Sequence, residues 1–271
     1  MTFKVLEVYV LIKQVPKSHS LRIDKSSGAL IRENIENIIN PDDLYALELA
    51  LTLKESYDAH TVVMTMGPPQ AESALREALA MGIDDAVLIS DPQFAYSDTL
   101  QTTLVIKEAF EYLKRYDLLI TGSETSDSST GQVPYQLSEA LDIPLITDIF
   151  EYKIEGRNFY CQRNFGHESQ NIQVELPIML RVRRHFNKPR HVPLLGIKKA
   201  FEKKIKIIDF NTLNCPDYLD GCNKSPTIVV KTEKFIPKRK NQFIEGTIKE
   251  QAEFIKNVMK ENGIERQWTG I

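Results

Sequence analysis

The 271-residue chain contains few cysteines and no long apolar run. Its cysteines, Cys161, Cys215 and Cys222, are odd in number and show no CxxC spacing, which argues against a disulfide framework or a zinc site. No apolar stretch reaches the roughly 20 residues that a membrane helix needs. The opening MTFKVLEVYVLIKQVP is typical of a first strand rather than of a signal peptide. We therefore expect a cytoplasmic protein that does not insert into membranes.

The chain also lacks a strong excess of charge of either sign. It carries 34 basic and 37 acidic residues, so its net charge is only −3. Such a balance provides no field that would draw the protein to nucleic acid, and we expect no nucleic-acid partner. The hydrophobic share of 42% is sufficient for a sizeable core.

The common motifs of catalysis are missing as well. The sequence contains no GxGxxG, GxxxxGK[ST], HExxH or GxSxG pattern. The five histidines show no ligand spacing, and no residue pair resembles a nucleophile with its base. The sequence therefore predicts no catalytic residue and no metal site. It indicates a chain that binds a ligand without performing bond chemistry itself.

What the sequence does contain is a regular alternation of strand and helix patterns. Helix-compatible segments separate the apolar runs; one of them begins at Asn40-Pro41-Asp42-Asp43, where Asn40 can cap, and another is capped by Ser97 or Asp98. This alternation predicts an α/β fold with a doubly wound, mostly parallel, Rossmann-like sheet. The predicted strands are Val8–Ile12, His60–Met66, Ala86–Ile89, Leu118–Thr121 and Leu145–Thr147.

The pattern changes after about residue 150. Short strands at Ile149–Ile154, Phe159–Arg163 and Asn171–Val174 predict a small β-hairpin excursion, after which Ile178–Val182 can return to the sheet. We expect an α/β domain over 1–210. The remainder, 211–271, is expected to form an extended arm that ends in a helix and packs on another subunit.

The most informative stretch is DLLITGSETSDSSTGQVPYQLSEAL at Asp117–Leu141. A buried strand is expected to end at Thr121, a loop of small polar residues follows, and a helix begins near Gly131. Ligands of parallel α/β sheets bind at the carboxyl ends of strands, where helix N-termini favour phosphate. The loop therefore suggests a nucleotide site. A solvated loop whose Ser and Thr only cap a helix explains the same residues.

A second candidate is the basic stretch from Arg181 to Lys206. Prolines and two leucines interrupt it: Pro189, Pro193, Leu194 and Leu195. Exposed leucines in a rigid, proline-bounded loop are typical of a partner-docking element, although a basic run of this kind is also compatible with a simple solvated face.

Several segments, taken in order, resemble the β subunit of an electron transfer flavoprotein over nearly the whole chain. They include VLIKQVP at Val10–Pro16, INPDDLYALELALTLKE at Ile39–Glu55, DLLITG at Asp117–Gly122 and NKPRHVPLLGIKKA at Asn187–Ala200. The resemblance implies a heterodimer with an α subunit that holds FAD. It also implies a second adenine nucleotide in this chain, and an acyl-CoA dehydrogenase-type flavoenzyme as electron-transfer partner.

Carried over by position, the resemblance implies a nucleotide site at the strand ends and in the loop. Its residues are Leu11, Asn40, Asp43, Met66, Gly122, Ser123, Glu124, Thr125, Asp127, Ser129, Thr130, Gly131, Gln132 and Val133. The implied docking residues are Pro189, Arg190, Leu194 and Leu195, with Leu194 as the anchor. The segment from Phe235 onward is implied to wrap the α subunit.

The family has two branches. Ordinary members hold a structural AMP in this pocket, whereas electron-bifurcating members hold a second FAD that NADH reduces, with ferredoxin or flavodoxin as low-potential acceptor. Asp42-Asp43 and Met66 resemble the bifurcating pattern and favour FAD. Ser123, Glu124 and Pro134 depart from it, because a lysine, a glutamine and a glycine are usual there. AMP stays the alternative, and an ATP-pyrophosphatase-type adenylating enzyme is a remote one.

Overall fold

The computed structural model describes residues 5–17, 36–166, 168–213, 219–220, 224–227 and 243–263, together with the backbone of 22–23 and 30–31. His167, Cys215, Cys222 and parts of the segment expected to wrap a partner, 235–242 and 264–271, lie outside the described residues. The chain divides into two compact units, Met1–Ile228 and Val229–Ile271. The prediction that 211–271 packs on another subunit stays a prediction.

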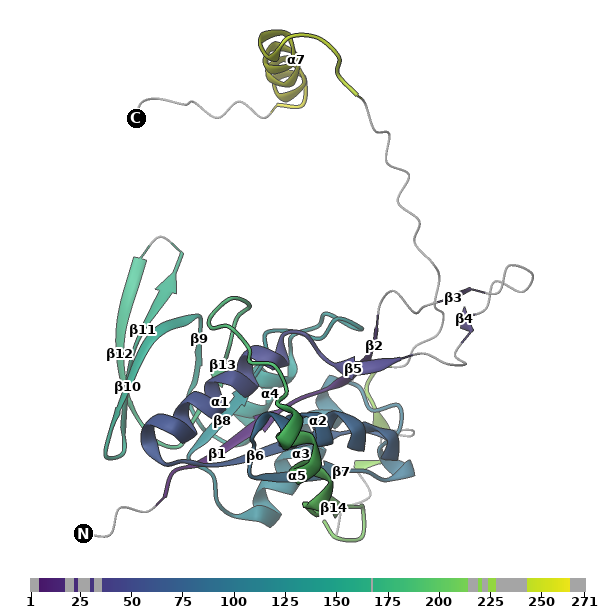
Figure 1. Ribbon diagram of the computed structural model, residues 1–271, viewed down its shortest axis with the longest axis vertical. Coiled ribbons are helices and arrows are strands. Elements are labelled where there is room, and N and C mark those ends of the chain that lie inside the picture. Colours follow the sequence, from purple (N-terminus) through teal and green to yellow (C-terminus); the bar gives the residue numbers. More distant parts are fainter. Residues whose placement is uncertain are drawn as a thin grey trace. The chain divides into compact units, whose positions relative to one another are not determined.

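A seven-stranded, fully parallel sheet forms the centre of the first unit (Figure 1). Its strands are β1 (Glu7–Leu11), β6 (His60–Met66), β7 (Asp85–Ile89), β8 (Leu118–Thr121), β9 (Leu145–Thr147), β13 (Ile178–Arg181) and β14 (Ile205–Ile208). The strand order is β14-β7-β6-β1-β8-β13-β9. The prediction of a mostly parallel α/β sheet is therefore confirmed.

Alternate residues of each strand face opposite layers of helices. One face packs against α1 (Asp43–Tyr57), α2 (Glu72–Met81) and α5 (Leu194–Glu202), and Val8, Val10, Leu118 and Ile120 are fully buried there. The other face packs against α3 (Thr99–Leu113) and α4 (Val133–Ala140). Helices on both faces define a doubly wound sheet. Two short 3-10 turns, η2 (Pro69–Ala71) and η3 (Pro92–Phe94), follow β6 and β7.

Local sequence signals set the helix ends. The Asp98 carboxylate accepts a hydrogen bond from the backbone N–H of Gln101 at 3.0 Å and caps α3, as predicted. Gly82, with φ of +123°, ends α2, because glycine adopts this backbone conformation at little cost.

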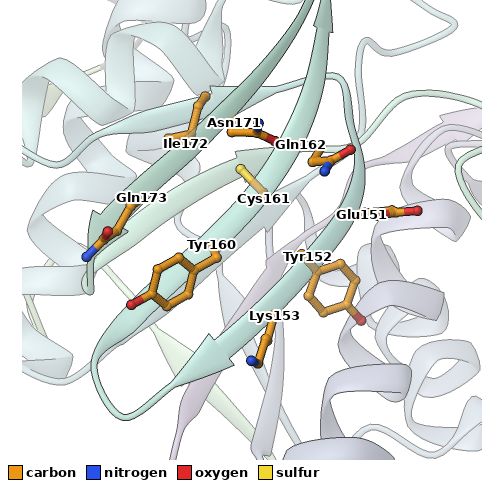
Figure 2. Close-up of a pocket in the computed structure, with 9 residues that line it drawn as sticks. All are labelled: Glu151, Tyr152, Lys153, Tyr160, Cys161, Gln162, Asn171, Ile172 and Gln173. Atoms are coloured by element: carbon orange, nitrogen blue, oxygen red, sulfur yellow. The ribbon is translucent and has the colours of Figure 1, made fainter.

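Strands β10 (Ile149–Glu155), β11 (Asn158–Phe165) and β12 (Glu168–Glu175) form a separate three-stranded antiparallel sheet, so the predicted hairpin excursion is confirmed. Figure 2 shows a hollow on this sheet that includes Tyr152, Tyr160 and Cys161. No residue assigned to a site from the sequence lines it. A two-stranded sheet of β2 (Gln14–Pro16) and β5 (Asn37–Ile39) and a short β3 (Arg22–Ile23) and β4 (Leu30–Ile31) pair complete the first unit.

The structure corrects the expectation of a loop around Leu194. Residues Leu194–Glu202 form α5, and the residues after it form the edge strand β14. The prolines and Gly196 made the segment resemble a loop. Pro193, however, occupies the position before the first helical residue, and Gly196 lets α5 approach α2 closely: a Cβ there would lie 3.1 Å from the Ala80 carbonyl carbon.

In the second unit, the described residues contain the helix α7 (Ile248–Glu261). Thr247 and Glu250 form a capping box at its start. None of its residues is buried, and Ile248, Ile255 and Met259 are exposed. Among the described helices of both units, none is long and apolar enough to cross a membrane.

Candidate functional site

The sheet has a switch point between β1 and β8. Strands β6, β7 and β14 lie on one side of β1, and β8, β13 and β9 lie on the other. The helix that follows β1 covers one face of the sheet, and the helix that follows β8 covers the opposite face. In open α/β sheets, ligands bind in the crevice that this reversal creates at the carboxyl ends of the strands.

The predicted nucleotide residues gather at this crevice. Leu11 ends β1 and lies opposite Thr121 at the end of β8, while Met66 ends the neighbouring β6. The loop from Gly122 to Gln132 leaves β8 and leads into α4. Residues separated by more than a hundred positions in the chain are thus brought to one edge of the sheet.

Asn40 ties the loop to the start of α1. Its side-chain amide donates to the Glu124 carbonyl at 2.8 Å, and its side-chain oxygen accepts from the Ser126 N–H at 3.0 Å. The expectation that Asn40 caps the helix is wrong, because α1 begins at Asp43 and Asp42 occupies the capping position. The Asn40 side chain is fully buried, and the loop backbone satisfies its donor and acceptor groups instead.

The Asp43 carboxylate bonds to the backbone just after β1 and just after β8. Its carboxylate accepts from the Lys13 backbone N–H at 2.7 Å, from the Asn40 amide at 3.1 Å and from the Gly122 backbone N–H. Burial raises the pKa of Asp43 to about 7, although these hydrogen bonds oppose the shift. Because its oxygens are used inside the protein, Asp43 supports the crevice and does not line it.

Two arginines that the sequence reasoning did not assign to this site lie beside the loop. Arg184 forms an ion pair with the buried Asp42, to which the Ser123 hydroxyl also donates. The Arg181 Nε donates to the Ser123 carbonyl at 3.0 Å, and its guanidinium lies 5.8 Å from the centre of the Tyr135 ring. A signal was present, because Ile178–Val182 was predicted to rejoin the sheet and residues after a parallel strand lie at its carboxyl edge.

The rest of the loop is exposed and internally bonded. Thr125 and Ser128 share a hydrogen bond of 2.9 Å, and the Ser129 N–H donates to the Thr125 carbonyl at 2.7 Å. Lys13 pairs with Asp127 at 2.7 Å. Burial raises the pKa of this carboxyl, but the hydrogen bonds from Lys13 and Thr125 and the charge of Lys13 together outweigh burial, so the pKa is lowered.

Several hydrogen-bonding groups at the crevice have no partner in the described part of the chain. The backbone N–H groups of Gly131, Gln132 and Val133, at the start of α4, donate to no other described residue. The Thr121 hydroxyl is buried without a hydrogen-bond partner there. Thr130 and Gln132 are exposed beside them. A phosphate group fits this set, because it accepts hydrogen bonds and is favoured at a helix N-terminus.

The predicted docking residues separate into two groups. Leu194 and Leu195 begin α5 with exposed fractions of 83% and 76%, so their predicted exposure is confirmed. Arg190 instead faces inward, where it pairs with Glu48 and Glu55 of α1. Pro189 is half-buried next to it.

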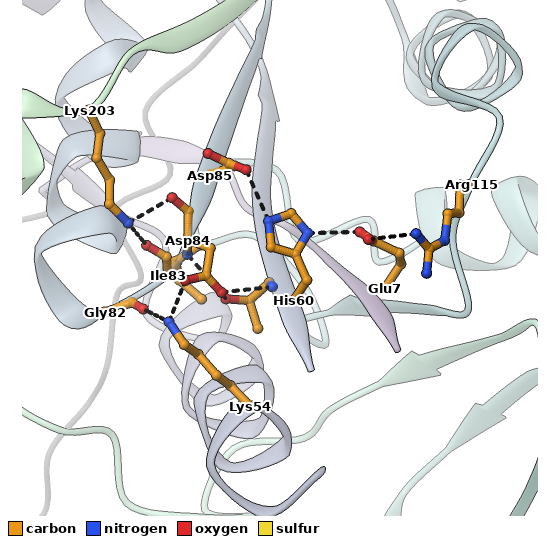
Figure 3. Close-up of polar contacts among 10 residues, drawn as sticks. Glu7, Lys54, His60, Gly82, Ile83, Asp84, Asp85, Arg115 and Lys203 are labelled. Carbon is orange, nitrogen blue, oxygen red and sulfur yellow. Dashed lines mark hydrogen bonds and ion pairs between the residues drawn. The ribbon is translucent and has the colours of Figure 1, made fainter. Parts of the chain in front are cut away.

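A different polar cluster occupies the opposite edge of the sheet (Figure 3). Glu7, His60 and Asp85 are the first residues of β1, β6 and β7. The His60 ring bonds to Glu7 at 2.9 Å and to Asp85 at 3.0 Å, and Arg115 pairs with Glu7 at 3.3 Å. This cluster joins the amino ends of three strands and lies across the sheet from the crevice.

The fold is that of a doubly wound α/β protein with a crevice at the switch point of its sheet. Residues 27–213 match the family model of the electron transfer flavoprotein domain. The chain therefore belongs to the electron transfer flavoprotein family.

Relatives of known name cover almost the whole chain. It is 37% identical to an electron transfer flavoprotein subunit beta of Clostridium acetobutylicum, over 94% of this chain and 98% of the relative. It is 36% identical to the caffeyl-CoA reductase-Etf complex subunit CarD of Acetobacterium woodii, over 96% and 100%. It is 35% identical to the acryloyl-CoA reductase electron transfer subunit gamma of Anaerotignum propionicum, over 92% and 96%.

Proposed function

We propose that this chain is the β subunit of a heterodimeric electron transfer flavoprotein and that it holds FAD in the crevice between β1 and β8. The observation that carries the proposal is the set of donors at the carboxyl edge that have no hydrogen-bond partner among the described residues. Three backbone N–H groups at the start of α4 and the buried Thr121 hydroxyl lie beside the Ser123 loop. Such an edge recognises the phosphates of a nucleotide.

The charge around the loop supports a diphosphate. Ser123 stands where a lysine is usual, yet Arg181 and Arg184 both contact the Ser123 region from the neighbouring strand end. Glu124 lies close enough to Arg184 to raise the pKa of that arginine, although Asp42 contributes more. When bound, FAD would supply the redox chemistry, and the chain's own residues would position its phosphates and exclude water.

The proposed partners are an α subunit that carries its own FAD and an acyl-CoA dehydrogenase-type flavoenzyme. The exposed apolar residues of α7 provide a surface for the α subunit, and Leu194 and Leu195 provide one for the flavoenzyme. The relatives whose names include caffeyl-CoA reductase and acryloyl-CoA reductase support a partner of this class. If the complex bifurcates electrons, NADH is the donor and ferredoxin or flavodoxin is the low-potential acceptor.

A conventional β subunit with structural AMP is the second candidate. Glu124 favours it, because this carboxylate adds negative charge to a pocket where the second phosphate of FAD would increase repulsion.

The decisive experiment measures the nucleotides of the complex purified with its α subunit. After denaturation, chromatography quantifies FAD and AMP per heterodimer. We expect two FAD in the wild type and loss of one in Gly131→Asp, because the new carboxylate stands at the phosphate end of α4. Gly166→Asp is the matched control: both glycines have positive φ, of +58° and +63°, but a Cβ at Gly166 meets nothing within 4 Å.

Each outcome selects one model. Two FAD retained in Gly131→Asp would exclude the crevice as the flavin site. One FAD and one AMP in the wild type would identify the conventional carrier. NADH oxidation that depends on both a dehydrogenase and ferredoxin would establish the bifurcating branch. Pyrophosphate release from ATP by the isolated chain would identify the adenylating enzyme instead.

A further inference from the structure

The segment that joins β13 to α5 is fastened along α1. Arg184 pairs with Asp42 before the first turn of the helix, and the Asn187 side-chain amide donates to the Tyr45 carbonyl at 2.9 Å. Arg190 pairs with Glu48 and Glu55 further along α1. Successive residues of the segment thus bond to successive turns of one buried helix.

Arg190 makes the most extensive of these contacts. Its Nε and Nη2 donate to the two Glu48 oxygens at 3.0 and 2.9 Å, and its backbone N–H donates to Glu48 at 2.9 Å. Its Nη1 donates to Glu55 at 2.5 Å. The guanidinium fork matches a carboxylate in this way, whereas a lysine ammonium cannot make the same pair of bonds. Glu48 is itself buried, and removing one partner of a buried ion pair is costly.

The exposed Leu194 and Leu195 come shortly after Arg190 in the chain. Leu194 begins α5 four positions after Arg190, and Gly196 seats that helix against α2, where a Cβ would lie 3.1 Å from the Ala80 carbonyl carbon. The start of α5 is therefore fixed on one side by Arg190 and on the other by Gly196. Leu194 and Leu195 themselves are 83% and 76% exposed, so little of either side chain is packed against the described part of the subunit.

We propose that Arg190 is a positioning residue: through Glu48 and Glu55, α1 holds the segment before α5 and so presents Leu194 and Leu195 to a flavoenzyme partner. The inference rests on the proposed docking function of the two leucines. It assigns the Arg190 guanidinium, whose side chain is 32% exposed, to contacts within the subunit instead of to contact with the partner.

The test separates positioning from direct contact. The full complex with its α subunit accepts electrons from a purified short-chain acyl-CoA dehydrogenase reduced with butyryl-CoA. The bleaching of the complex's flavin absorbance, followed at increasing concentrations of the complex, gives kcat and the KM that describes the interaction with the dehydrogenase. We expect Arg190→Gln and Glu48→Gln each to raise KM about tenfold and to change kcat by less than about twofold. The double variant should raise KM no further than either single variant, because both substitutions remove the same Arg190–Glu48 ion pair. Arg190→Lys should rescue part of the loss.

Glu48 is buried and cannot touch a partner, so the Glu48→Gln variant distinguishes positioning of the leucines from direct contact between Arg190 and the partner. If Arg190→Gln raises KM and Glu48→Gln does not, Arg190 contacts the partner directly and the inference is overturned. If Leu194→Ala leaves KM unchanged, the docking function itself fails and the inference fails with it. If Leu194→Ala raises KM while the Arg190 and Glu48 variants do not, only the inference fails.

Two controls exclude general damage. Arg157→Gln removes an arginine that pairs with Asp117 and Glu175 on a different part of the fold, and it should leave KM unchanged. Should Glu48→Gln destabilise the subunit, Glu55→Gln replaces it, because its side chain is 59% exposed and the substitution leaves no buried group unpaired. Positioning is then measured with the Arg190→Gln/Glu55→Gln double variant, whose KM should be no higher than that of Arg190→Gln alone. Nucleotide content and circular dichroism should match the wild type in every variant used.

Discussion

The close approach of Gly122 to α1 leads to a prediction about both stability and nucleotide binding. Gly122 follows β8 and packs on the beginning of α1. In Gly122→Ala, the new Cβ would overlap the Asp43 carboxylate and lie 2.8 Å from the Asp42 carbonyl carbon and 2.9 Å from the Asp43 nitrogen. Two of these three atoms belong to the backbone, so a change of rotamer cannot relieve the overlap. The ends of β8 and α1 must move apart.

The size of the effect follows from two losses. Overpacking against a rigid neighbour costs about 1–3 kcal/mol, and loss of the Gly122 N–H bond to the buried Asp43 carboxylate costs about 1.5–3 kcal/mol. We expect a total of about 3–5 kcal/mol, because the two losses partly share one displacement. For a domain of this size, the melting temperature should fall by about 10 °C. The β nucleotide should also be lost, since the Gly122–Val133 loop shifts with the strand end.

The assay combines denaturation monitored by circular dichroism with nucleotide analysis of the same preparation. Gly67→Ala is the control, because it follows β6 at the same edge and its Cβ would meet only the Ala71 methyl, at 3.2 Å. It should cost less than about 1 kcal/mol and retain the nucleotide. A Gly122→Ala complex with wild-type stability would refute the packing argument. A destabilised complex with full nucleotide would refute the link between packing and the site.

Two further predictions concern the other edge of the sheet and the α2–α5 contact. Burial lowers the pKa of His60, but the carboxylates of Glu7 and Asp85 outweigh burial and raise the pKa above its ordinary 6.5. The ion pairs therefore contribute fully to the stability of the fold below pH 6.5. This contribution is lost as the pH rises through the folded-state pKa of His60. Urea denaturation of His60→Gln and wild type should therefore differ most near pH 6 and less near pH 8.5; an equal difference at both values would contradict the protonated pairing. Gly196→Ala should displace α5 from Ala80 and raise KM for the dehydrogenase with unchanged nucleotide content, and an unchanged KM would show that α5 tolerates the shift.

Local patterns were enough to predict most of the sheet. The bounds predicted for His60–Met66, Leu118–Thr121 and Leu145–Thr147 agree with the structure, because apolar runs bounded by polar and turn residues carry their own signal. The position of the candidate loop also followed from the sequence, since a strand, a polar loop and a helix start occur in immediate succession.

The contacts that organise the site could not be predicted in this way. Arg184 lies 142 positions from Asp42, and Asn40 lies 84 positions from Glu124, so their pairing depends on the folded sheet and not on any local pattern. The helix α5 was missed for a related reason. Its glycine is explained only by the Ala80 carbonyl on α2, a contact between elements far apart in the sequence. Lysines that alternate with isoleucines likewise concealed the edge strand β14.

These long-range contacts converge on α1. Before and within its first turn, Asp42 and Asp43 support the Gly122–Val133 loop, and in the next turn Glu48 holds the segment that leads to Leu194. Beside Glu48, the side chains of Ala46, Leu47 and Leu49 are buried in the core, so the helix cannot shift without disturbing the sheet. A single buried helix thus contacts both the loop at the crevice and the segment that leads to the exposed leucines, which is why variants at Glu48 and Gly122 test two consequences of one arrangement.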